Sequence, residues 1–332
     1  MNATPGHQMN FSGASEPILE GQKARAYFRA NASSLPEDAW YDLDDLMVDV
    51  AQERLNFVAD LQALGLVDSV SLGQTITSWQ ETNSFQEADI DMTPRSIGAE
   101  DASVFVTKYA PVPIIHQDFR INRRAGDAHD IRGTDAPKAF RSIMEMLEDL
   151  ALSGWDQSVV DADGREATIY GVTNHPDRNE VTGSSWATAS NVDPDLREGI
   201  AELKANNYYG PYRLYIAGDV DDHLMAPSPD FDNMRLRQQV SELSAIQSVV
   251  PCDRLNDGEA VMIQMTADVI DAKMIDGGPT DMAEWENTPF ETVVKAFGGF
   301  SPRVKSDMGE DADTETGTGN RQSGIAHLTG LS

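Results

Sequence analysis

The sequence has a single cysteine, only seven lysines and no long hydrophobic run. One thiol, Cys252, cannot form a disulfide within the chain, and its apolar neighbours predict a small buried side chain rather than a nucleophile. No stretch approaches about 18 consecutive apolar residues, and the N-terminus lacks the charged lead and apolar core of an export signal. We therefore expect a chain without disulfides, export signal or membrane contact.

Basic residues are also scarce relative to acidic ones. The 332 residues include 55 acidic and 25 basic side chains, which gives a formal charge of −30. This excess excludes a basic module that reads DNA. The bias towards Asp over Glu (35 to 20) and towards Arg over Lys (18 to 7) favours a protein adapted to high salt, with an ordinary acidic cytosolic protein as the alternative. A hydrophobic content of 40% excludes a wholly disordered acidic chain.

The first half of the chain changes character twice. Residues 1–20 are rich in Ser, Gly, Pro and Asn, which favours an extended arm that becomes ordered on assembly. Apolar residues then recur at helical spacing over 36–64. Two β-rich segments, 75–79 and 103–109, flank a long polar connection and predict a protruding hairpin. Such a projection buries little within its own subunit, so we expect its apolar residues to contact another subunit: Trp79, Phe85 and Ile90.

A long helix and a second unit follow. Asp135 and Pro137 are typical of a helix start, and the apolar stripe beyond them predicts a helix over about 136–160. Asp193 and Pro194 open a second α/β unit in the same way. The further elements that we expect are a strand over 114–121, a strand over 212–216, a helix over 233–248, and strands over 260–265, 291–297 and 324–328.

The sequence offers little catalytic chemistry. The six histidines are scattered without helical i,i+4 pairing, and no cysteine cluster or glycine-rich phosphate loop is present. Adjacent Asp221, Asp222 and His223 point in different directions on a short helix and are a weak acid/base candidate. We therefore expect no catalytic residue, no cofactor and no metal site. A soluble halophilic hydrolase that uses this group with a divalent ion remains the least favoured alternative.

The order of these parts carries a resemblance: an arm, a helix, a long hairpin, a long helix, a glycine-containing loop, a compact α/β unit and returning strands. Its most specific stretches are IYGVTNHP at 169–176, GPYRLYI at 210–216, and the ending over 297–304 and 323–328. The chain resembles the Hong Kong 97-type major capsid proteins of tailed double-stranded DNA viruses, and their relatives the encapsulins. The resemblance implies an α+β fold with an N-terminal arm (1–45), an extended loop (71–115), a peripheral domain (46–70, 116–191 and 257–332) with the long helix as its spine, and an axial domain (192–256).

The resemblance also implies a function. Subunits would assemble as hexamers and pentamers into the icosahedral head of a virion, made in the host cytoplasm, which encloses double-stranded DNA without reading its sequence. Scaffold, portal and decoration proteins are possible partners, and an encapsulin-type shell filled with cargo protein is the main alternative. We expect Arg95, Arg123 and Arg124 to form ion pairs with neighbouring subunits, although pairs within the chain suit the last two equally well. No lysine occurs between Gln74 and Asp101, so we expect no covalent cross-link through this loop.

Overall fold

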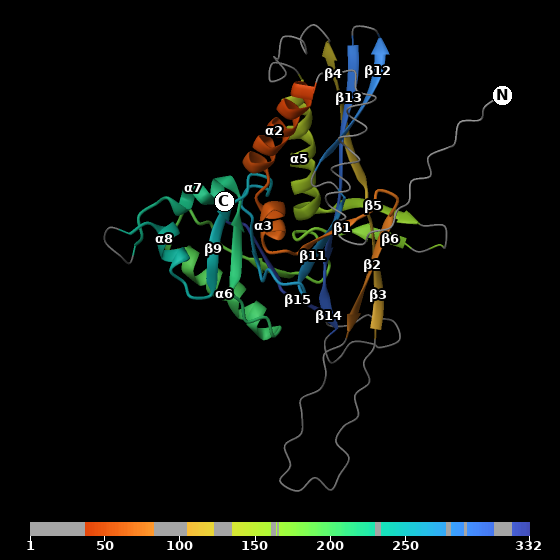
Figure 1. Ribbon diagram of the computed structural model, residues 1–332. Helices are drawn as coiled ribbons and strands as arrows, with labels where there is room; N and C mark the ends of the chain where they lie inside the picture. The colour runs from red at the N-terminus through yellow and green to blue at the C-terminus, as the bar shows by residue number, and fades with distance from the viewer. Residues whose placement is uncertain are drawn as a thin grey trace, which may run out of the picture.

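The computed structural model describes residues 37–82, 105–122, 135–160, 164, 166–229, 234–276, 280–288, 291–308 and 321–332. These residues form a mixed α+β fold with two main sheets, three two-stranded hairpins and helices packed beside the sheets (Figure 1). One hydrophobic cluster of buried side chains extends through both sheet units. Within the described residues, no helix combines the length and the apolar character needed to cross a membrane.

The first sheet is organised around the 14-residue strand β13 (Glu291–Val304). One half of β13 pairs with β4 (Ile114–Asn122) and β12 (Asp281–Thr288), and its end pairs with β11 (Ile270–Ile275), all antiparallel. The sheet closes with β1 (Val67–Val70), which runs parallel to β11. The expected strands over 114–121 and 291–297 are therefore confirmed, although β13 continues well beyond its expected end.

Three helices cover this sheet. Helix α5 (Ala136–Ser153) packs on β4 and β13, and α2 (Glu37–Arg54) and α3 (Phe57–Ala63) lie beside α5 (Figure 1). The ring of Phe140 on α5 meets Phe119 on β4 edge to face, with centroids 5.7 Å apart. The arm expected over 1–45 is helical from residue 37, because the apolar stripe that begins at Trp40 is buried in the core. Residues 1–36 lie outside the described part of the chain.

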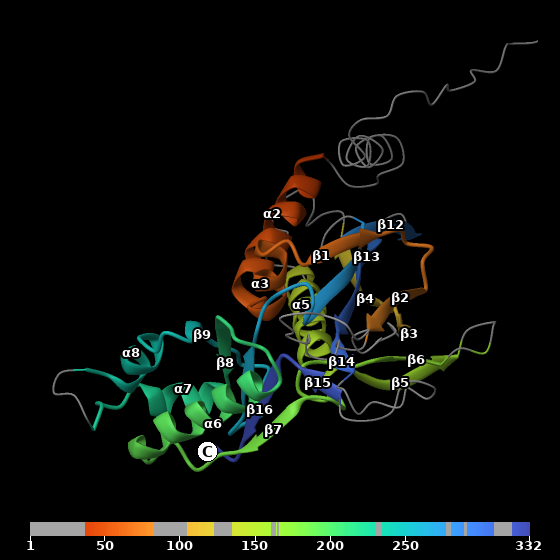
Figure 2. The ribbon, with the colours of Figure 1, turned by 90° about the horizontal axis from the view of Figure 1, so that it is seen from below.

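The expected long helix over 136–160 ends early, at Ser153. Gly154 follows with φ of 70°, and residues after it form β5 (Trp155–Val160), which pairs with β6 (Glu166–Ile169). A Cβ on Gly154 would lie 2.5 Å from the carbonyl oxygen of Ile169, so only glycine fits this reversal. The β5–β6 hairpin projects from the body on the side opposite the second sheet (Figure 2).

The second sheet has the strand order β7 (Asn179–Thr182), β16 (Ile325–Thr329), β10 (Ala260–Ile263), β8 (Tyr212–Ile216) and β9 (Ile246–Pro251). The accompanying helical segments are the 3-10 turn η2 (Ala189–Asn191), α6 (Val192–Ala205), α7 (Gly218–Leu224) and α8 (Leu236–Ser241). The strands expected over 212–216, 260–265 and 324–328 are confirmed. The helix expected over 233–248 is found only over Leu236–Ser241, and residues 246–251 form β9, parallel to β8.

Candidate assembly site at the base of the β2–β3 hairpin

The hairpin expected from the sequence is formed by β2 (Ile76–Thr82) and β3 (Phe105–Pro111), paired antiparallel from Ile76 opposite Pro111 to Thr82 opposite Phe105. Side chains alternate between two faces of this ribbon. Thr77 and Glu81 are buried on the inner face, whereas Ser78 and Gln80 on the outer face are exposed. A two-stranded ribbon is marginally stable by itself, so the packing of its inner face is what fixes its position.

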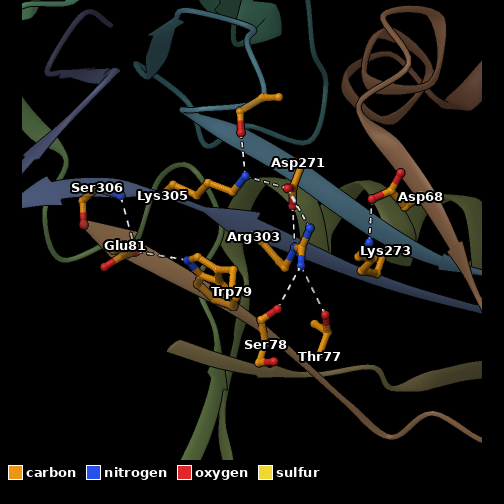
Figure 3. A network of polar contacts seen from close by, with 11 residues as sticks. Asp68, Thr77, Ser78, Trp79, Glu81, Asp271, Lys273, Arg303, Lys305 and Ser306 are labelled. Carbon is orange, nitrogen blue, oxygen red and sulfur yellow. Dashed lines mark hydrogen bonds and ion pairs between the residues drawn. The ribbon is translucent and has the colours of Figure 1, made fainter. Parts of the chain in front are cut away.

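The inner face packs against a buried ion pair. Arg303 on β13 and Asp271 on β11 are only 7% and 9% exposed, and they form two parallel contacts, Nε to Oδ1 at 2.5 Å and Nη2 to Oδ2 at 2.7 Å (Figure 3). Lys305 Nζ also lies 2.7 Å from Asp271 Oδ2 and donates to the carbonyl oxygen of Ala267. Buried charges of this kind are tolerated because each has partners in good geometry.

Arg303 also reaches the hairpin. Its Nη1 group lies 3.4 Å from Thr77 Oγ1 and 3.3 Å from the carbonyl oxygen of Ser78, both of which can accept its hydrogens. Its guanidinium carbon lies 5.9 Å from the ring centroid of Trp79, within the range of a cation–π contact. A single side chain thus joins strand β13 to strand β2.

Glu81 supplies a second attachment. Its Oε1 atom accepts the indole N–H of Trp79 at 3.1 Å and the backbone N–H of Ser306 at 3.4 Å (Figure 3). Ser306 begins the short strand β14 (Ser306–Met308), which pairs with β15 (Arg321–Ser323), and its hydroxyl donates to Asp177 Oδ2 at 2.7 Å. We call these contacts of Thr77, Ser78, Trp79 and Glu81 with Asp271, Arg303, Lys305 and Ser306 the hairpin base.

A neighbouring ion pair lies on the same sheet. Lys273 Nζ on β11 is 2.5 Å from Asp68 Oδ2 on β1, and this contact lowers the pKa of the Asp68 carboxyl. Lys273 and Lys305 therefore lie beside and within the hairpin base, each paired with an aspartate. The arrangement balances positive and negative charges locally and holds the β2–β3 ribbon against the first sheet.

A known protein family matches most of the chain. Residues 29–277 match the model of DUF6260, a family of unknown function. The chain belongs to this family. No curated protein matches the sequence.

Solved structures identify the fold. A virus-like particle from Pyrococcus furiosus matches with a TM-score of 0.58 and 15% identity over 86% of this chain and 97% of that one. The capsid of Myoviridae phage XM1 gives 0.53 and 12% over 81% and 91%, and the capsid of an empty GTA particle gives 0.55 and 11% over 84% and 91%. These neighbours have the Hong Kong 97-type capsid fold, and the DUF6260 chain shares it. The resemblance read from the sequence is confirmed as far as the fold.

The expected contact residues fall into two groups. Trp79 lies in the hairpin base, half-buried, and its indole is engaged by Glu81 and Arg303 of the same chain. Its contact with another subunit therefore stays a prediction. The remaining candidates lie outside the described residues: Phe85, Ile90, Arg95, Arg123 and Arg124.

Sequence reasoning missed Arg303, Asp271 and Glu81. Arg303 and Asp271 are 32 residues apart on adjacent strands, and neither belongs to a motif. The only available signal was that the run from Arg303 to Lys305 is a rare basic spot in an acidic chain. That signal has meaning only when the sheet register is known.

One residue of the alternative site on α7, Asp221, forms a structural ion pair. Asp221 pairs with Arg237, whose Nη1 atom is 2.5 Å from Asp221 Oδ1, and Arg237 also donates to the carbonyl oxygen of Val249. In the part of the chain that the structure describes, no group of three His, Cys, Asp or Glu side chains could hold a metal ion. The prediction that Cys252 is buried is confirmed, and burial raises the pKa of its thiol to about 12.

Proposed function

We propose that this DUF6260 chain is the subunit of an icosahedral protein shell and has no enzymatic activity. The observation that carries the proposal is the hairpin base. A buried ion pair fixes the two-stranded β2–β3 ribbon to the first sheet, while Phe105 at the far end of its described part is 59% exposed. Surface that is held in place but left uncovered suits contact with another copy of the chain. The capsid fold supports this reading.

The finer proposal is the head of a tailed virus. Pentamers and hexamers of the chain, made in the host cytoplasm, would enclose double-stranded DNA in the virion, with scaffold, portal and decoration proteins as further partners. The acidic composition suits a virus whose host lives in high salt, since at about 1 M salt the screening length is only about 3 Å. Counterions rather than lysines would then neutralise the packed DNA, which the shell holds by enclosure.

A loop-shortening variant tests the shell proposal without disturbing the hairpin base. Residues 83–104 are replaced by Asn-Gly, which closes the hairpin directly between Thr82 and Phe105 with a tight turn. We expect the variant to keep the circular dichroism spectrum and thermal unfolding of the parent but to remain small oligomers in electron micrographs. Closed particles of normal size from this variant would contradict the proposal, and so would a parent chain that never forms particles.

The likeness to the Pyrococcus virus-like particle, over 97% of that chain, favours a cargo shell as a second candidate. The contents of purified particles separate the two functions. Nuclease-resistant DNA of genome length supports the viral head, whereas a captured protein in stoichiometric amount supports the cargo shell. Elution of the active species as a small oligomer with hydrolase activity would instead favour the enzyme, which we rank last.

A further inference from the structure

His327, near the middle of strand β16, is buried and has two different neighbours. The residue is only 5% exposed. Its Nδ1 atom accepts the Nε–H of Arg178 at 3.3 Å. Because an arginine Nε always carries a hydrogen, Nδ1 must be unprotonated, and the proton of the neutral ring sits on Nε2. Nε2 has no hydrogen-bond partner among the described residues, but Glu259 Oε2 lies 3.7 Å from it.

Arg178 uses the same guanidinium to organise the turn that leads into the second sheet. Its Nη1 group donates to the carbonyl oxygen of His175 at 2.9 Å, and its Nη2 group pairs with Glu180 on β7. The bond to His327 therefore ties this turn to strand β16. If that bond is lost, the turn keeps its internal contacts but loses its polar link to His327.

The same turn also contacts the hairpin base. Asp177 precedes Arg178 in the chain, and its Oδ2 atom accepts the hydroxyl hydrogen of Ser306 at 2.7 Å. The backbone N–H of Ser306 donates to Glu81, which also holds the indole of Trp79 (Figure 3). Hydrogen bonds, together with the peptide bond between Asp177 and Arg178, thus connect His327 to Trp79.

We propose that His327 is a proton-operated switch that sets how firmly the β2–β3 hairpin is held. A solvent proton binds Nδ1, and the Nε–H of Arg178 must then withdraw because two donors cannot face each other. The resulting imidazolium pairs through Nε2–H with the carboxylate of Glu259, which Asn256 Nδ2 already orients at 3.1 Å. The switch has two discrete states, one with His327 bonded to Arg178 and one with His327 paired to Glu259. Its role in a shell rests on the proposed function.

The surroundings set the direction of the switch. Burial, with a smaller contribution from the charge of Arg178, lowers the pKa of His327 below its ordinary value of about 6.5, while Glu259 and Glu180 work in the opposite direction. The other charged or titratable groups of the turn are His175 and Asp177. At neutral pH the ring is therefore uncharged and bonded to Arg178. As the pH falls through the lowered pKa, this bond is lost and the hairpin base loosens.

The fluorescence of Trp79 reports the state of the hairpin base. The Trp79 signal is the fluorescence of the parent minus that of the Trp79→Phe variant. Both are recorded from pH 8 to pH 4.5 on the assembled protein. The parent should show one transition with a midpoint below pH 6.5. His327→Gln should remove it, because a glutamine can accept from Arg178 and donate to Glu259 but does not titrate. His116→Gln is the matched control, since His116 is exposed on β4, and it should keep the parent midpoint. An unchanged midpoint in His327→Gln would overturn the proposal.

A second variant keeps the test decisive if His327→Gln does not fold. Glu259→Gln removes the anion that stabilises the imidazolium, so the midpoint should move to lower pH by about one unit, a roughly tenfold loss of proton affinity. No movement would overturn the switch. Electron micrographs of the same samples judge the proposed function separately: absent particles contradict the shell, whereas the Trp79 transition reports on the switch in any assembly state.

Discussion

Glu148 on α5 accepts the backbone N–H of Phe57 at 2.6 Å, although the two residues are 91 positions apart in the sequence. The same carboxylate accepts the N–H groups of Asn56 at 3.2 Å and Val58 at 3.1 Å. These are donors at the start of α3, where Asn56 makes no capping bond with its own side chain. Glu148, which is 0% exposed, therefore caps a neighbouring helix across the core.

Helix α3 transmits this contact to the second sheet. The ring of Phe57 meets Tyr215 on β8 edge to face, with centroids 4.9 Å apart, and Asp60 accepts the hydroxyl hydrogen of Tyr215 at 2.6 Å. Arg213 also pairs with Asp60 at 2.5 Å, and this contact raises the pKa of the guanidinium. The short helix thus contacts α5 at its N-terminus through Glu148 and the second sheet through Phe57 and Asp60.

Replacing Glu148 should destabilise the fold according to how many donors are left unpaired. Glu148→Leu leaves two buried N–H groups and one partly buried N–H group without an acceptor, so we expect the free energy of unfolding to fall by about 3 kcal/mol or more. Glu148→Gln keeps one acceptor oxygen and should lose about 1–2 kcal/mol. Urea denaturation measures both. Glu145→Gln on the same helix, where Glu145 lies 3.9 Å from Arg254, is the control and should stay within about 0.5 kcal/mol of the parent. Equal effects of the two glutamine variants would contradict the capping role.

The sequence predicted elements well where one chain segment carries the whole signal. The apolar stripe of α5 and its proline start were sufficient to place that helix, and alternation placed β2, β3 and β4. The errors occur where pairing with a strand from another part of the sequence determines the secondary structure. Residues 155–160 form a strand because β6 folds back on them, and residues 246–251 form a strand because β8 offers a parallel edge.

The hairpin base could not be predicted for the same reason. Arg303 meets Thr77 only because the end of β13 lies beside the start of β2, and the two residues are 226 positions apart. The two β-rich segments did predict that β2 and β3 pair, because that inference depends on local composition rather than on any one distant contact. The partner of each buried charge can be predicted only when the register of the strands is known.

The Arg303–Asp271 pair should show strong energetic coupling. Arg303→Met keeps the length of the side chain but leaves the buried Asp271 with Lys305 as its remaining ionic partner, so we expect a loss of about 3–5 kcal/mol. Adding Asp271→Leu to the same chain removes the carboxylate that has lost Arg303. Part of the lost free energy of unfolding should then be restored. A double-mutant cycle from urea denaturation measures the coupling, which we expect to reach about 2 kcal/mol. Strictly additive effects would show that the pair does not act as a unit.

Two glycines with the same positive φ differ in the space around them. Gly154 and Gly65 both have φ of 70°, but a Cβ on Gly65 would meet nothing within 4 Å, whereas one on Gly154 would lie 2.5 Å from the carbonyl oxygen of Ile169. Gly65→Ala should therefore lower the free energy of unfolding only by the cost of a positive φ for alanine, about 1–2 kcal/mol. Gly154→Ala should cost several kcal/mol, seen as a lower thermal midpoint, because the backbone of Ile169 and Gly171 must move. Similar thermal midpoints for the two variants would contradict the close backbone approach at Gly154, and with it the end of α5 at Ser153.

Salt should stabilise this protein through its exposed charges and not through the hairpin base. The formal charge of −30 repels itself over about 10 Å in 0.1 M salt but over only about 3 Å in 1 M salt, so we expect the thermal midpoint to rise steadily between these concentrations. Sodium chloride and potassium chloride should act alike, because screening depends on ionic strength. The buried Arg303–Asp271 pair is shielded from solvent ions, so the cost of Arg303→Met should be the same at both concentrations. A midpoint that does not depend on salt would remove the argument for a salt-adapted source, while a salt-dependent cost of Arg303→Met would mean that water reaches the hairpin base.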